Sequence, residues 1–242
     1  MKKIWKYRFY YYLALPGLIY FIIFHYVPMG GALIAFKDIS PFDGLRGFFD
    51  APWVGFKHFE RFTSSVYFLD VIENTLIISG LKILFGFPAP IILALLLNEV
   101  LRMSLKRIMQ TISYLPHFIS WVVTAGMITA LLATSGGLLT ETINDFTGSN
   151  INFLGNKDYF VGILVTSHVW KTIGWSSIIY LAAMSSIDPA LYESARIDGA
   201  NRLQMAWHIT LPSIMFVIVI MFLLEIGNLL EAGFEQILLL YS

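Results

Sequence analysis

Long apolar stretches dominate this sequence of 242 residues, and they restrict it to a membrane fold. A helix needs about 20 mostly apolar residues to cross roughly 30 Å of hydrocarbon. Charged residues make up only 13% of the chain, against roughly 25% in soluble domains. We therefore expect an all-α, polytopic membrane helical bundle of five spans, forming a single domain over residues 1–242. The expected spans are residues 10–36, 70–97, 108–133, 159–184 and 211–227.

Several expected spans contain helix-breaking residues. Pro88 and Pro90 follow Gly86 in the second, and Pro116 lies in the third. Proline removes a backbone donor and kinks a helix, which a membrane bundle tolerates where neighbouring helices satisfy the freed carbonyls. We expect kinks at these positions.

Net charge and cysteine content exclude several classes of function. The net charge is zero, which gives no electrostatic basis for binding nucleic acid. The absence of cysteine excludes disulfides, thiolate metal sites and a cysteine nucleophile. The basic start followed by an apolar run is not a signal peptide, because the run is too long and lacks a cleavage site before Pro28.

The distribution of lysine and arginine predicts the orientation, since short cytoplasmic loops carry more of these residues. With the N-terminus in the cytoplasm, nine lie on the inner side and five on the outer side. Trp5 and the tyrosines that follow it would form an aromatic belt at the inner interface. The inner residues are Lys2, Lys3, Lys6, Arg8, Arg102, Lys106, Arg107, Arg196 and Arg202; the outer ones are Lys37, Arg46, Lys57, Arg61 and Lys157.

The C-terminal end of the sequence is apolar. Five spans from a cytoplasmic start leave this end outside, in the run Leu238 to Tyr241. We expect a further segment beyond Ser242, containing one more span.

The polar segment of residues 185–210 lies in a cytoplasmic loop by this topology. Asp188 is a good N-cap with Pro189 at the first helical position. Gly199 can end the helix. The segment predicts two short helices along the membrane surface, with small side chains that allow another protein to approach closely.

This segment resembles the EAA motif of importer permeases of the ATP-binding-cassette superfamily. The matching residues are Glu193, Ser194, Ala195, Asp198, Gly199 and Ala200, followed by Ile209, Leu211 and Pro212. The sequence departs at Ser194, where the family usually has Ala, and at Ala206, where an aromatic is common. The alternative interpretation is that the segment is an ordinary amphipathic helix at the membrane interface.

The resemblance continues along most of the chain. Its motifs are similar to the carbohydrate-uptake branch, and those near the two ends to its complex-oligosaccharide members. They are Leu15-Pro16-Gly17-Leu18, His25-Tyr26-Val27-Pro28-Met29, Asn74-Thr75, Tyr114-Leu115-Pro116, Asp188-Pro189 and Gly233-Phe234-Glu235-Gln236.

The resemblance implies a type I importer permease in a bacterial cell membrane, without an ATPase site of its own. It implies three protein partners: a cytoplasmic ATP-binding-cassette ATPase dimer, a second and related permease subunit, and an extracellular solute-binding protein. ATP and Mg²⁺ would bind to the ATPase, so no cofactor or metal is expected in this chain. Glu193, Ser194, Ala195, Asp198, Gly199 and Ala200 would form the coupling helix that contacts the ATPase.

Ionisable side chains inside spans are candidates for the substrate pathway, because they are costly in lipid. Lys171 and Trp175 lie four residues apart and share a helix face. An aromatic face can stack on a sugar ring, and a lysine suits a sugar that carries uronic acid carboxylates. The candidate pathway residues are Lys82, His168, Lys171, Trp175, Glu225 and Asn228.

Structural roles compete with these assignments. Lys82 and Glu225 could pair with each other, and His168 and Trp170 could be packing residues. His25 and His117 are lone histidines in apolar surroundings, and we expect them to be structural.

Two other classes of protein compete with the importer interpretation. An ATP-independent secondary transporter of a small polar solute often has inverted repeats, and none is visible here. An intramembrane enzyme would need a catalytic pattern such as His-Glu-x-x-His or Gly-x-Ser-x-Gly, and neither occurs. The sequence also has no phosphate-binding Gly-x-x-x-x-Gly-Lys loop, so any ATP hydrolysis belongs to a partner.

Overall fold

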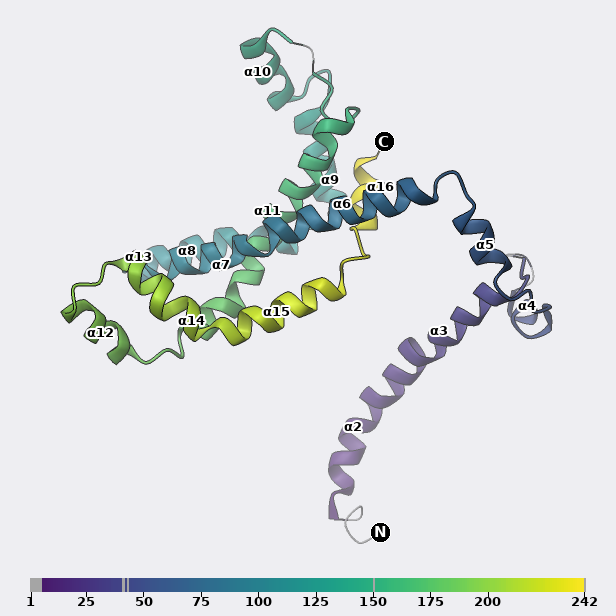
Figure 1. The fold of residues 1–242 in the computed structure, drawn as a ribbon, viewed down its shortest axis with the longest axis horizontal. Helices are drawn as coiled ribbons and strands as arrows, with labels where there is room; N and C mark the ends of the chain where they lie inside the picture. Colours follow the sequence, from purple (N-terminus) through teal and green to yellow (C-terminus); the bar gives the residue numbers. More distant parts are fainter. Residues whose placement is uncertain (1–5, 41, 43, 150, 242) are drawn as a thin grey trace. The chain divides into compact units, whose positions relative to one another are not determined.

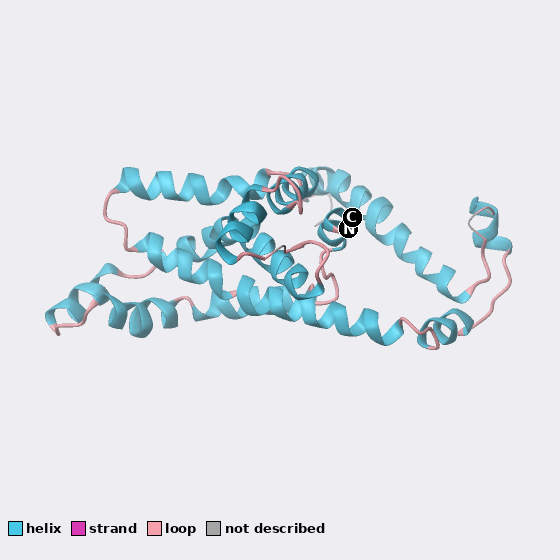
Figure 2. Cartoon of the chain, turned by 90° about the horizontal axis from the view of Figure 1, so that it is seen from above, coloured by secondary structure: helices cyan, strands magenta, loops and turns pink. Residues whose placement is uncertain are grey.

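The computed structural model describes residues 6–40, 42, 44–149 and 151–241. Within these ranges the regular secondary structure is helical. Strand-like backbone pairing there is limited to an isolated antiparallel bridge between Lys37 and Trp53. Figures 1 and 2 show the helices as rods joined by loops. The all-α prediction is confirmed. Lys2, Lys3 and Trp5, on which the orientation partly depends, lie outside the described residues.

The helices long and apolar enough to cross a membrane match the first two expected spans closely. In the described part of the chain two qualify directly, Arg8–Phe36 and Phe68–Asn98. The number rises to four if each of two bent helix pairs is one span. Helix α11 (Lys157–Met184) has 28 residues, enough for a fifth, but it is less apolar because it contains His168 and Lys171.

The chain divides into two compact units, residues 1–71 and 72–242. The prediction of a single membrane domain therefore stays a prediction. In the first unit an apolar helical rod consists of α2 (Arg8–Phe21), the π-helix Ile22–Tyr26, α3 (Val27–Met29) and the 3-10 helix Gly30–Phe36. Its side chains face outward, as expected of a rod surrounded by lipid or by other helices. Two short helices follow, α4 (Gly44–Asp50) and α5 (Lys57–Thr63).

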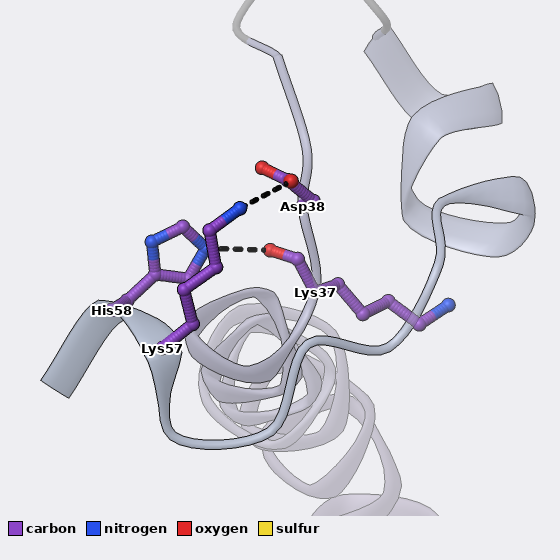
Figure 3. Close-up of polar contacts among 4 residues, drawn as sticks. All are labelled: Lys37, Asp38, Lys57 and His58. Carbon is purple, nitrogen blue, oxygen red and sulfur yellow. Dashed lines mark hydrogen bonds and ion pairs between the residues drawn. The ribbon is translucent and has the colours of Figure 1, made fainter. Parts of the chain in front are cut away.

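Polar contacts join the end of this rod to α5 (Figure 3). Lys57 Nζ lies 2.9 Å from Asp38 Oδ2, and His58 Nε2 lies 3.0 Å from the Lys37 carbonyl oxygen. The Lys37 side chain is buried and donates to the carbonyls of Phe48 and Phe49, at 2.8 and 3.2 Å. Lys37 thus connects the rod, α4 and α5 into one folded segment.

The second unit contains the remaining helices. They are α6 (Phe68–Gly86), α7 (Pro88–Asn98), α8 (Met103–Tyr114), η3 (Leu115–Phe118), α9 (Trp121–Leu132), α10 (Leu138–Thr147), α11, α12 (Pro189–Ile197), α13 (Arg202–Met205), η4 (Ala206–Thr210), α14 (Leu211–Ser213), α15 (Met215–Gly227) and α16 (Phe234–Leu240). Helix α11 is central: it packs against α7, α8, η3 and α15.

The third expected span, residues 108–133, is not one straight helix. The chain leaves the helix after η3, because Ile119 and Ser120 have extended backbone, and α9 then starts with Ser120 as its N-cap. The two halves meet at 99°. Pro116 lies just before this bend, so a kink was expected, but a turn of this size was not.

Two apolar clusters hold the second unit together. The first places Ile91 and Ala94 of α7 against Tyr180 and Met184 of α11, with Ile214 before α15. The second gathers Ile78, Ala125, Leu164 and Leu240 from four helices.

Gly174 lets α11 approach the end of α8 closely. A Cβ atom there would overlap the Ser113 backbone carbonyl at the end of α8. Any larger residue would force the two backbones apart.

Candidate functional site

A cavity of about 290 Å³ lies where α6, α11 and the end of α15 meet the non-helical residues before α16. Polar side chains face it from several helices, together with the indole of Trp121. Such a mixture of hydrogen-bonding groups and an aromatic ring is typical of sites for polar ligands. The cavity is lined by Ser79, Lys82, Ile83, Trp121, His168, Glu225, Asn228, Leu229, Glu231, Ala232, Gly233 and Gln236.

Lys82 is the lysine of this cavity wall, and only 6% of its surface is exposed. Its Nζ donates to the Ala232 carbonyl at 2.8 Å and to Gln236 Oε1 at 2.6 Å. Among the described residues it forms no ion pair with Glu225, so the alternative in which these two side chains pair is not seen. Neutral acceptors hold this ammonium in place.

Gln236 connects three helices around Lys82. Its side chain is 1% exposed, and its Nε2 donates to the Leu164 carbonyl and to Ser167 Oγ, both at 2.8 Å. Because both Nε2 contacts are acceptors, the amide oxygen must face Lys82. Gln236 of α16 thereby fixes the lysine of α6 relative to α11.

Gly233 allows the chain to turn into α16 beside Lys82. Its φ of +85° lies in the left-handed region, which favours glycine. A Cβ atom at this position would lie 2.6 Å from Lys82 Nζ. The turn therefore needs glycine both for its backbone conformation and for space.

His168 and Glu225 reach a second, smaller cavity as well. This cavity, of about 120 Å³, lies between α7, α11 and α15. The His168 ring also packs beside Gly86, where a Cβ atom would lie 3.5 Å away. The two side chains therefore lie on the wall between neighbouring cavities.

Four of the six predicted pathway residues, Lys82, His168, Glu225 and Asn228, line the larger cavity together. The structure does not bring Lys171 and Trp175 there. Their role in a substrate pathway stays a prediction.

Lys171 instead supports the bend between η3 and α9. Its side chain is 7% exposed, and its Nζ donates to the carbonyls of Pro116, His117 and Ile119. The ammonium also lies 5.3 Å from the ring centroid of Trp121. Trp121 lines the cavity, so Lys171 lies behind one of the side chains of the cavity wall.

Trp175 packs on the same bend from outside the cavity. Its ring stacks on His117 at 4.6 Å with an interplanar angle of 1°, and the Phe118 ring meets it edge-on. Lys171 and Trp175 do share a helix face, but this face contacts η3. Trp175 is also 44% exposed.

The predicted coupling segment contains α12, α13 and η4. Asp188 caps α12 by accepting from the Ala190 N–H at 2.9 Å, with Pro189 at the first position, as the sequence indicated. Gly199 ends α12 with a φ of +81°, and no atom lies within 4 Å of the place a Cβ would take. The glycine is therefore required by backbone conformation, and the space beside it is open.

Several contacts fix this segment without covering it. The hydroxyls of Tyr192 and Thr210 lie 2.9 Å apart, which joins α12 to η4, and Arg202 lies 3.3 Å from Glu99. Glu193, Ser194, Asp198 and Gly199 are exposed, and Ala195 and Ala200 are half-buried. A concavity of about 360 Å³ lies between α12 and η4, and its lining includes Ala195, Asp198, Gly199 and Ala200. The segment therefore presents an accessible, concave surface.

Sequence reasoning missed four polar or aromatic residues of the cavity: Ser79, Trp121, Glu231 and Gln236. Gln236 is followed by an apolar run, and a lone amide in such a setting is a signal of a buried contact. Trp121 and Glu231 lie at the edges of expected spans, where aromatic and acidic residues are ordinary. Among the described residues, no three His, Asp or Glu side chains are placed to hold a metal ion.

The known proteins that this chain resembles are components of transport systems. Residues 86–240 match the family described as "Binding-protein-dependent transport system inner membrane component". A polygalacturonan/rhamnogalacturonan transport system permease protein of Bacillus subtilis is 48% identical over 99% of this chain and 74% of its own length. An sn-glycerol-3-phosphate transport system permease protein of Pectobacterium atrosepticum is 33% identical over 93% of this chain and 73% of its own length.

Two solved structures have the same fold. One is a bacterial ABC transporter involved in the import of the acidic polysaccharide alginate; the matching chain is 44% identical, with a TM-score of 0.89 over 100% of this chain and 80% of that one. The other is a bacterial alginate ABC transporter in complex with an alginate pentasaccharide-bound periplasmic protein, at 43% identity and a TM-score of 0.88 over 100% of this chain and 79% of that one.

Proposed function

We propose that this chain, which belongs to the family of binding-protein-dependent transport system inner membrane components, carries an acidic oligosaccharide across the membrane. Family and relatives make it an inner membrane permease subunit of an ABC importer of carbohydrates, and favour this function over an ATP-independent secondary transporter. The finer assignments of substrate, path and partners are our proposal.

The cavity around Lys82 supports a route for the sugar through this subunit. It combines hydroxyl, amide, carboxylate and ammonium groups with an indole ring, in a unit that is otherwise held together by apolar clusters. Sugar hydroxyls both donate and accept hydrogen bonds, and these groups supply partners of both kinds. This cavity is the single observation on which the proposed path depends.

The names of the relatives support an acidic sugar as the substrate. One is named for polygalacturonan and rhamnogalacturonan, and another belongs to an importer of the acidic polysaccharide alginate. Polygalacturonan and alginate are both chains of uronic acids. An oligosaccharide with carboxylates is therefore the substrate we propose for this chain.

The coupling segment is proposed to contact a cytoplasmic ATPase that binds ATP and Mg²⁺. Its exposed acidic residues and its open concavity suit a protein partner. We further propose a second, related permease subunit, an extracellular binding protein and an N-terminus in the cytoplasm.

Reconstituted uptake tests the function. The chain, its ATPase and its second permease are placed in vesicles with the binding protein, and uptake of an oligogalacturonate and an alginate oligosaccharide is measured. We expect uptake of at least one of them, and only with ATP. Uptake without ATP or without the ATPase would contradict the proposal, because a secondary transporter needs neither.

The ATPase contact has its own test. Glu193→Lys and Asp198→Lys should each weaken copurification of the ATPase, because they reverse exposed charges on the coupling segment. Asp145→Lys, which reverses an exposed charge on α10, is the control. Equal ATPase recovery from all three variants would refute the contact.

A further inference from the structure

Lys82 brings a buried positive charge to the cavity wall without a carboxylate partner among the described residues. Its two acceptors, the Ala232 carbonyl and Gln236 Oε1, are neutral. An ammonium has three N–H donors, so these contacts leave one unused. A buried charge is stabilised when an opposite charge and a hydrogen bond meet it.

The position of this ammonium is fixed before any ligand arrives. Gln236 cannot turn its amide without losing its bonds to Leu164 and Ser167, so its oxygen stays on Lys82. Gly233 keeps the backbone close to the ammonium. A ligand that meets Lys82 therefore does not have to order a flexible side chain first.

We propose that Lys82 binds a carboxylate of the sugar during translocation and thereby makes this subunit selective for acidic oligosaccharides. This inference rests on the transport function and path proposed above. The sugar carboxylate accepts the unused N–H in a charge-assisted hydrogen bond. Glu225 and Glu231 on the same wall can accept from sugar hydroxyls, but they repel a carboxylate. The charges of the wall therefore direct a carboxylate to Lys82.

The experiment compares an acidic sugar with its uncharged counterpart in the complete importer. Oligogalacturonate and its methyl ester share their ring hydroxyls and differ in the charge of the carboxyl groups. Uptake per assembled complex is measured at saturating loaded binding protein, so that the affinity of that protein does not enter the ratio. Lys82→Gln keeps hydrogen-bond donors without the charge, and Lys82→Arg keeps the charge. Lys37→Gln is the matched control, because Lys37 is also buried and also donates to backbone carbonyls, but it does not line the cavity.

We expect the wild-type importer to prefer the acid. Lys82→Gln should lower the acid-to-ester ratio by roughly tenfold, the size of one charge-assisted hydrogen bond. Lys82→Arg should retain most of the preference. Lys37→Gln should leave the ratio unchanged, even if uptake of both sugars falls.

Failure of this inference differs from failure of the transport function. An unchanged ratio in assembled Lys82→Gln would overturn the role of Lys82 while uptake still supports the function. Equal wild-type uptake of acid and ester would overturn it too, even if the variants do not assemble. No ATP-dependent wild-type uptake of any acidic sugar would overturn both.

Discussion

Replacing Lys171 with methionine should destabilise the second unit by about 2–4 kcal/mol. Methionine keeps most of the length of lysine and removes the ammonium that three carbonyls share. The Pro116 carbonyl also accepts from the Ile119 N–H, whereas among the described residues no other donor reaches the carbonyls of His117 and Ile119. Two acceptors left without a partner would cost about 2–6 kcal/mol. We expect the lower part of that range, because hydrogen bonds between membrane helices are worth less on average.

The assay is denaturant unfolding of the purified chain in detergent. Lys57→Met is the control, because Lys57 forms an exposed ion pair with Asp38, and such pairs contribute little. Lys171→Met should unfold at clearly lower denaturant than wild type, and Lys57→Met close to wild type. If Lys171→Met unfolds with the wild-type free energy, the ammonium does not support the bend.

Three further predictions concern other parts of the chain. Gly199→Leu should fold but uncouple ATP hydrolysis from uptake. Leucine at a φ of +81° strains the backbone by about 1–2 kcal/mol, and its side chain fills the open space beside it. Wild-type coupling of hydrolysis to uptake in this variant would contradict the prediction. Reporter fusions after Met103 and Gly148 should read cytoplasmic and extracytoplasmic, respectively, and the opposite pattern would reverse the proposed orientation. The hydrogen bond and charge of Lys57 hold the pKa of Asp38 below its usual value of 3.8. Their contact should therefore stabilise the first unit above about pH 4 and be lost as the pH falls through that lowered pKa. An NMR titration of the Asp38 carboxyl tests whether its pKa is lowered, and a raised pKa would refute the prediction.

The sequence predicted helices and caps well because their signals are local. Asp188 and Pro189 begin α12 and Gly199 ends it by short-range geometry that one segment contains in full. The pathway candidates that share the cavity were found because an ionisable group is costly in lipid wherever it lies. Lys82 and Glu225 were identified in this way, although their partners were not.

The position of Lys171 could not be predicted, because it depends on the bend at Ile119 and Ser120. Neither residue is a glycine or proline, and nothing nearby shows that the chain turns by 99°. Only the folded bend presents carbonyls to the ammonium. Gln236 is similar, since its partners Leu164 and Ser167 are about 70 residues away in sequence.

Helix α11 can act as a rigid lever between the start of α12 and the cavity. Its 28 residues contain no proline, and at 1.5 Å per residue they make a rod of about 42 Å. Four residues separate one end from the start of α12, His168 and Lys171 lie near the middle, and the backbone of α8 touches the helix at Gly174. A tilt of about 5° around that contact would move Lys157 at one end by about 2 Å and Met184 at the other end by about 1.3 Å. His168 at the cavity would shift by about 0.8 Å and Lys171 at the bend by about 0.4 Å. A displacement at the α12 end therefore reaches His168 in the opposite direction and at about 60% of its size, with Gly174 as the pivot.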